Sequence, residues 1–288
     1  MYILEWVSLV VFFAQIAGNV LLGGDISAHA DLVPLPISPA TYAFSVWAVI
    51  YLLELTMLIH KIASISGKSS LNSTEQHQRV VFHMLHIARC VLNVFWIVLF
   101  TNDLLGPSFV CVAACCGVSF AMYIIEYVSV PFSATAPMRM IGTRWSLAVY
   151  AAWTGLATTL SANIYLTYEV LDRTCADYSL SLGVAGGILV LVGALWQEPM
   201  FGLVALWFLV ALLVRLTGDE SDLPVTWCVS HVRHVDVALI PICLCASLAA
   251  LASMYQRVAR DRRDAARVAG LQTGPKRASL VGNMSLSN

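Results

Sequence analysis

Eight long apolar runs constrain what this chain can fold into more than any other feature of its sequence. A helix that crosses a lipid bilayer needs roughly 17–25 predominantly apolar residues, and each run is close to that length. The runs are Trp6–Leu22, Tyr42–Ile62, Val81–Phe100, Pro107–Tyr127, Trp145–Tyr168, Leu180–Trp196, Met200–Leu216 and Val235–Tyr255. Charged residues make up only 11% of the chain, whereas soluble domains carry about 25%. We therefore expect an all-α fold, a polytopic membrane helical bundle with about eight transmembrane helices.

The absence of several motifs argues against several classes of protein. The sequence contains no nucleophile placed with a base, no phosphate-binding loop and no surface suited to nucleic acid, so we assign no catalytic residue and no nucleic-acid partner. Its cysteines and histidines match no standard metal-ligand spacing, so we assign no metal site. The absence of a visible internal repeat disfavours an inverted-repeat transporter. Only Gln197, Glu198 and Pro199 separate the sixth and seventh runs, which predicts a tight helical hairpin.

The basic residues are distributed unevenly between the two sides of the predicted bundle. An even number of spans places both termini on one side of the membrane. The loops and tail of that side hold Lys61, Lys68, Arg79, Arg139, Arg144, Arg257, Arg260, Arg262, Arg263, Arg267, Lys276 and Arg277. The opposite side carries only Arg173, Arg215 and Arg233. Because Lys and Arg are enriched in cytoplasmic loops, we predict that both termini are cytoplasmic.

Two cysteines, Cys175 and Cys228, fall in loops of the side opposite the termini. An oxidising compartment permits a disulfide between them, while two free thiols are the default. The C-terminal segment, residues 257–288, starts as a basic helical continuation and then becomes rich in Gly and Ser. This composition is typical of a disordered tail, and its basic residues could also attach to anionic lipid headgroups.

The second apolar run opens with a pattern that predicts a capped helix. Ser38 followed by Pro39 is a typical helix start, with a hydroxyl at the N-cap and proline at the first helical position. Tyr51 follows Trp47 by four residues and Glu54 follows it by seven, so the three share one helix face. A carboxylate inside the bilayer is costly and points to function. The alternative is that the aromatic side chains only pack and that a partner satisfies Glu54.

The third apolar run carries a polar stripe. Residues three or four positions apart share a helix face, and here these are Arg79, His83, His86, Cys90, Asn93 and Trp96 or Phe100. Arg89 sits beside this face, at a depth similar to that of Glu54 when each residue adds about 1.5 Å. We predict an intramembrane ion pair between Glu54 and Arg89, which serves function or only holds the helices together. The spacing of His83 and His86 suits the axial ligands of one haem poorly, and we expect both at the membrane interface.

Three patches carry a family resemblance. The first runs from Asn19 through Gly24-Asp25-Ile26-Ser27 to Pro39-Ala40-Thr41-Tyr42-Ala43-Phe44-Ser45-Val46-Trp47 and Tyr51. The second is Leu92-Asn93-Val94-Phe95-Trp96, and the third is Tyr150-Ala151-Ala152-Trp153 with Ala157-Thr158. In order and spacing they resemble the TspO/MBR family of tryptophan-rich sensory or translocator proteins, and the longer members most. The similarity covers about residues 15–168.

The resemblance implies an architecture and a ligand class. It implies a TspO-like five-helix core over residues 1–170, three additional transmembrane helices over 171–256 and a tail over 257–288. Family ligands are porphyrins, haem and sterols, bound in an aromatic-lined pocket closed by the loop between the first two helices. Porphyrin or haem therefore enters as a ligand, and no cofactor is required. The pocket residues carried over by position are Trp47, Tyr51, Asn93, Trp96 and Trp153. Implied partners are membrane lipid, a hydrophobic small molecule and a second copy in a homodimer.

Three functions compete at this point. The leading interpretation is an integral membrane protein that binds tetrapyrrole-type or sterol-type ligands as a sensor, carrier or scavenger. An alternative is a secondary transporter of a small organic substrate, because eight spans and buried polar groups permit one. A further alternative is a porphyrin-degrading membrane enzyme, for which the sequence offers tryptophans but no acid–base constellation. We therefore assign no enzymatic activity.

Overall fold

The structure is a computed structural model that describes residues 3–32, 35–66, 73–129, 140–170, 175–217 and 226–272. Over these ranges the chain forms helices and no strand. The α-helices are α1 (Ile3–Leu32), α2 (Val46–Ser66), α3 (Ser73–Thr101), α4 (Leu105–Ser129), α6 (Ser146–Tyr165), α7 (Cys175–Trp196), α8 (Pro199–Leu216) and α9 (Thr226–Gln272). Three short turns complete the described elements: the 3-10 turn η1 (Thr41–Ser45) and the π-helical turns η3 (Met140–Trp145) and η4 (Leu166–Val170).

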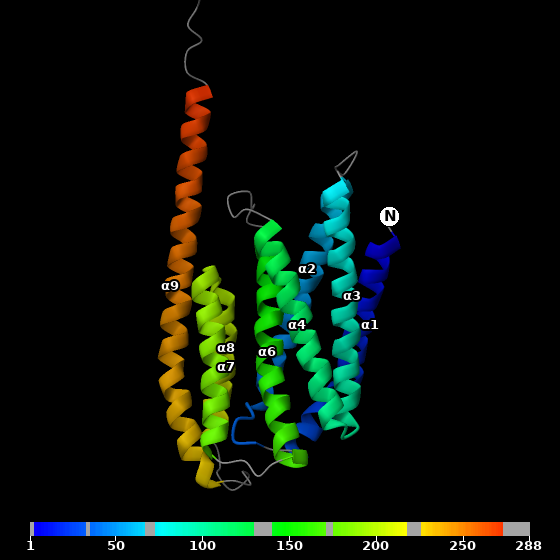
Figure 1. The fold of residues 1–288 in the computed structure, drawn as a ribbon, viewed down its shortest axis with the longest axis vertical. Coiled ribbons are helices and arrows are strands. Elements are labelled where there is room, and N and C mark those ends of the chain that lie inside the picture. The colour runs from blue at the N-terminus through cyan, green and yellow to red at the C-terminus, as the bar shows by residue number, and fades with distance from the viewer. Residues whose placement is uncertain are drawn as a thin grey trace, which may run out of the picture.

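Every predicted apolar run lies within helical structure, and the all-α polytopic bundle is confirmed. Seven of the described helices are long and apolar enough to cross a membrane, α6 being the exception. Successive helices alternate in direction, so that α1 begins and α9 ends at the same end of the bundle (Figure 1). We call this the terminal end. That the terminal end faces the cytoplasm stays a prediction.

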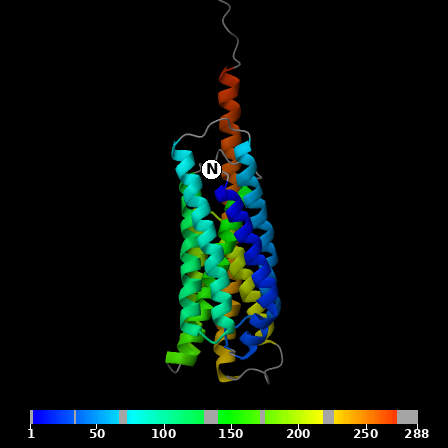
Figure 2. The same cartoon turned by 90° about the vertical axis from the view of Figure 1, so that its right-hand side faces the viewer.

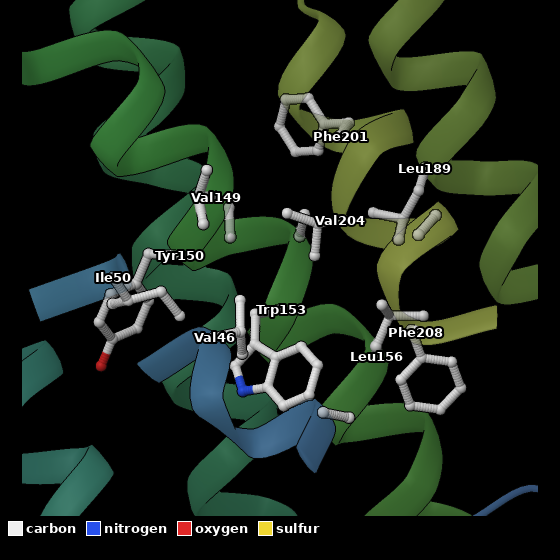
Figure 3. Packing of buried hydrophobic residues seen from close by; sticks show 14 of the residues in the cluster. Val46, Ile50, Val149, Tyr150, Trp153, Leu156, Leu189, Phe201, Val204 and Phe208 are labelled. Atoms are coloured by element: carbon white, nitrogen blue, oxygen red, sulfur yellow. The ribbon is translucent and has the colours of Figure 1, made fainter. Parts of the chain in front are cut away.

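Helix α6 joins the two halves of the bundle. On one side it contacts α2 and α4, and on the other it contacts α7 and α8. Thirteen of its twenty residues are buried. A helix enclosed by other helices does not need a lipid-facing apolar surface, which explains why α6 tolerates more Ser and Thr than its neighbours. In Figure 3, Trp153 of α6 lies between Val46 of α2 and Phe208 of α8.

The predicted start of the second helix is wrong by two residues. Helical structure begins with η1 at Thr41, and Ala40 is in an extended conformation with ψ 146°. The Ser38 hydroxyl accepts a hydrogen bond from the Leu35 amide at 3.2 Å, within a turn that precedes the helix. The Ala40 amide donates to the carbonyl of Ala211 in α8 at 3.0 Å. This contact with a distant helix, which no local pattern could reveal, holds Ala40 out of the helix.

The C-terminal helices form the predicted hairpin and a long final helix. Gln197, with φ 52°, turns the chain between α7 and α8, and the Glu198 amide donates to the Gly193 carbonyl at 2.8 Å. Helix α9 runs to Gln272 and projects beyond the other helices at the terminal end (Figure 1). The basic segment that follows Tyr255 is therefore helical at first, as the sequence predicts. Residues 273–288 and the side chains of Cys175 and Cys228 lie outside the described part of the chain, so the predictions made for them stay predictions.

Candidate ligand-binding site

An aromatic cluster is centred on Trp47, in the first turn of α2. Its ring stacks on that of Tyr51, with ring centroids 5.7 Å apart and an interplanar angle of 23°. The ring of Trp96 from α3 lies 6.2 Å away, and the rings of Tyr150 and Trp153 from α6 lie 5.8 and 6.4 Å away, both edge-on. Offset and edge-to-face rings at these separations attract one another beyond simple area burial. The structure thus gathers aromatic residues of α2, α3 and α6 that are far apart in sequence.

A narrow cleft opens beside this cluster, at the end of the bundle opposite the terminal end. It encloses about 720 Å³ of empty space, open solvent included. Its lining consists of Ser38, Pro39, Thr41, Phe44, Trp96, Phe100, Trp153, Ala157, Leu160, Ser161, Ile164, Phe208 and Arg215. Five of these side chains are aromatic, and Arg215 is the only charged residue among them.

The sequence-predicted pocket residues occupy two layers. Trp96 and Trp153 line the cleft itself. Trp47 touches both of their rings from behind, and Tyr51 stacks on Trp47. Asn93 is 1% exposed and lies one helical turn before Trp96. The roles of all five in ligand binding stay predictions.

Above the cleft, a polar seam joins the parallel helices α1 and α3, which lie side by side (Figure 2). At its inner end, the side-chain amides of Gln15 and Asn19 both donate to Asn93 Oδ1, at 3.1 and 2.9 Å. Nearer the terminal end, Ser8 Oγ and His86 Nδ1 lie 2.8 Å apart, and Arg79 forms an ion pair with Glu5. In a membrane, helices gain no hydrophobic driving force by associating, and interhelical hydrogen bonds help to hold them together. This seam therefore fixes α1 against α3.

The buried charges that the sequence singles out lie next to this seam, between α2 and α3. Arg89 donates a hydrogen bond from Nη2 to Glu54 Oε1, and both side chains are 0% exposed. His86 Nε2 lies 2.8 Å from the same carboxylate oxygen. The guanidinium of Arg89 also lies over the Tyr150 ring, 3.9 Å from its centroid, in a cation–π contact. The structure therefore brings Glu54 and Arg89 together and connects them to the aromatic cluster through Tyr150.

The two histidines of α3 are buried within the bundle, and their expected position at the membrane interface stays a prediction. His83 is 1% exposed and His86 is 0% exposed, because α1 covers this face of α3 with polar side chains. His83 Nε2 lies 3.9 Å from Glu5 Oε1. Glu5, Ser8 and Gln15 are the residues of α1 that the sequence reasoning missed. Their spacing of three and seven residues in an apolar run was the signal that could have found them.

Four buried polar atoms around the cluster have no hydrogen-bond partner in the described part of the chain. They are Tyr51 OH, Asn93 Nδ2, Trp96 Nε1 and Trp153 Nε1. Each buried donor left unsatisfied costs about 1–3 kcal/mol. Native structures satisfy most such groups, so unpaired donors beside a cleft point to a ligand or water that pairs with them.

Comparison with known proteins identifies the family. The TSPO-like protein family matches residues 3–258. Curated proteins and solved structures give no match. The family match extends from α1 into α9, so it includes the three C-terminal helices as well as the five that carry the sequence resemblance. This chain belongs to the TSPO-like proteins of the TspO/MBR family, and it is a multi-pass membrane protein of the TspO type.

Proposed function

We propose that this protein binds a flat hydrophobic ring ligand with an acidic side group, of the tetrapyrrole type, in the cleft between η1, α3, α6 and α8. The observation that carries this proposal is the lining of the cleft, in which five aromatic side chains accompany a single cation, Arg215. Ligand pockets are mostly apolar, with a few placed polar groups that fix orientation. A sensor, carrier or scavenger needs no chemistry beyond such binding.

The walls of the cleft favour a planar ligand. The cleft encloses about 720 Å³ of empty space, open solvent included, and five of its lining side chains are aromatic. Aromatic walls offer stacking surfaces to a planar ring system. The indole Nε1 atoms of Trp96 and Trp153, which have no partner in the described ranges, are donors for acceptor atoms of such a ligand.

Arg215 favours a tetrapyrrole acid over a sterol. It occupies the last turn of α8 and lines the cleft. A guanidinium pairs with a carboxylate through charge-assisted hydrogen bonds, which a neutral sterol does not offer. A hydrogen bond to a charged group contributes roughly 1.5–3 kcal/mol. We take the lower part of that range because Arg215 is half-buried, so its loss corresponds to about a tenfold change in affinity.

The test is a titration of the purified full-length protein with protoporphyrin, followed by quenching of tryptophan fluorescence. Arg215→Gln is expected to weaken protoporphyrin binding about tenfold, and to leave binding of the neutral dimethyl ester unchanged. The matched control is Arg233→Gln, because Arg233 is exposed on α9 and does not line the cleft. Cholesterol serves as the competing neutral ligand. Equal affinity of wild-type protein for the acid, the ester and cholesterol would refute the assignment of Arg215, and no binding of any of them would refute the proposed function.

A further inference from the structure

A second cluster of chemically active side chains lies between α2 and α3, apart from the cleft. It consists of Glu54, His86 and Cys90, whose ligating atoms all lie within 4.8 Å of one another. All three residues are buried, and none of them lines the cleft. His86 and Cys90 are four residues apart and share a face of α3, and Glu54 projects toward them from α2.

We propose that Glu54, His86 and Cys90 bind a thiophilic transition metal ion, Cu(I) or Zn(II). Thiolate and imidazole are the donors that these ions prefer, whereas Mg²⁺ and Ca²⁺ require oxygen donors. The Cys90 sulfur lies 3.9 Å from His86 Nε2, and that nitrogen lies 2.8 Å from Glu54 Oε1. These separations are those of atoms that can share one ion at bond lengths of about 2.0–2.3 Å.

The surroundings of the cluster match those of a metal site. Metal-ligating histidines are held by a hydrogen bond to their other ring nitrogen. Here Ser8 Oγ lies 2.8 Å from His86 Nδ1, which leaves Nε2 directed at the cluster. Ligating carboxylates are also held by hydrogen bonds, and Arg89 binds Glu54 Oε1. The other oxygen, Oε2, has no hydrogen-bond partner among the described residues.

Arg89 does not exclude a cation, because the thiol of Cys90 can supply a compensating charge. Binding requires the thiolate, so the sulfur–hydrogen bond breaks, a sulfur–metal bond forms and the proton leaves to solvent. With Cu(I), one positive charge replaces one proton and the net charge of the cluster is unchanged. With Zn(II), the cluster gains one positive charge. Since charge is costly in a buried site of low dielectric constant, the monovalent ion is the favoured occupant.

The test uses full-length protein in detergent, freed of metal with a chelator and free of tetrapyrrole. Cu(I) under anaerobic conditions, or Zn(II), is added in competition with a chromophoric chelator, and bound metal is measured by elemental analysis. We expect one ion per chain, and X-ray absorption should detect a sulfur ligand. Cys90→Ser should remove the sulfur signal and weaken binding at least 100-fold, and His86→Gln should weaken it at least tenfold.

Two control variants separate the proposed site from incidental binding. Cys243→Ser changes another fully buried cysteine, on α9, and His83→Gln changes the neighbouring buried histidine of α3. Neither variant should alter the stoichiometry or the affinity. Because Cys90→Ser is nearly isosteric, it tests the site without disturbing the packing of α3. A stoichiometry far below one, or binding unaffected by Cys90→Ser, would overturn the proposal. Neither result would affect the tetrapyrrole cleft, which shares no residue with this site.

Discussion

Breaking the buried ion pair of α2 and α3 should destabilise the protein strongly. Glu54→Gln keeps the size of the side chain but removes its charge. Arg89, which is 0% exposed, then stays buried without a carboxylate partner. Removing one partner of a buried pair typically costs about 3–5 kcal/mol, because the other charge stays buried and uncompensated. The cation–π contact of Arg89 with Tyr150 offsets part of this, by about 0.5–2 kcal/mol. We therefore expect a loss of roughly 2–4 kcal/mol in the free energy of unfolding.

The assay is equilibrium unfolding of the purified protein in mixed micelles of increasing SDS content, followed by circular dichroism. A chelator is present throughout, so that no bound metal contributes to the difference. Asp236→Asn is the matched control, because it makes the same carboxyl-to-amide change at a residue of α9 that is also 0% exposed. Neither carboxyl oxygen of Asp236 has a partner in the part of the chain that the structure describes. The control therefore loses no pair and should not destabilise the protein.

A double variant separates the charge effect from a packing effect. In Glu54→Leu combined with Arg89→Met, both charges are replaced by apolar groups of similar volume. Such replacement of a buried pair is often neutral or stabilising, so the double variant should be more stable than Glu54→Gln. The reasoning would be refuted if Glu54→Gln cost no more than Asp236→Asn, or if the double variant were the least stable of the set.

Three further predictions concern the C-terminal helices. Burial raises the pKa of Glu198 to about 7, above the value of about 4.3 expected when the chain is unfolded. Stability should therefore fall as the pH rises from about 4.5 to 7, and Glu198→Gln should reduce this dependence, as SDS unfolding at several pH values would show. A Cβ at Gly202 of α8 would collide with the Ser247 hydroxyl of α9, so Gly202→Ala should cost about 1–3 kcal/mol in the same assay. Phe208 pairs with Trp153 at 6.3 Å, and Phe208→Ala should weaken protoporphyrin binding about 2- to 10-fold, whereas the exposed Val210 of the same helix should tolerate Ala without effect.

The fold was predictable because bilayer-spanning helices need long apolar runs, and this requirement is visible in any single sequence. Periodicity also placed Trp47, Tyr51 and Glu54 on one face of α2, and the structure has Trp47 stacked on Tyr51, with Glu54 buried farther along α2 toward the terminal end. The start of α2 was not predictable. A contact between Ala40 and Ala211, 171 residues apart, decides it, and no sequence window contains both.

The lining of the cleft also depends on contacts between residues that are far apart in the sequence. Trp96 and Trp153 lie within the patches that resemble the family, but Phe208 and Arg215 do not, and they became wall residues only because α8 packs against α6 and η1. The Trp207 indole fixes that docking by donating to the Ala43 carbonyl at 3.1 Å. The cation of the cleft therefore comes from the C-terminal helices, while most of its aromatic rings come from the first five. A pocket inferred from the five-helix core alone would have carried no charged side chain in its lining and could not have distinguished an acidic ligand from a neutral one.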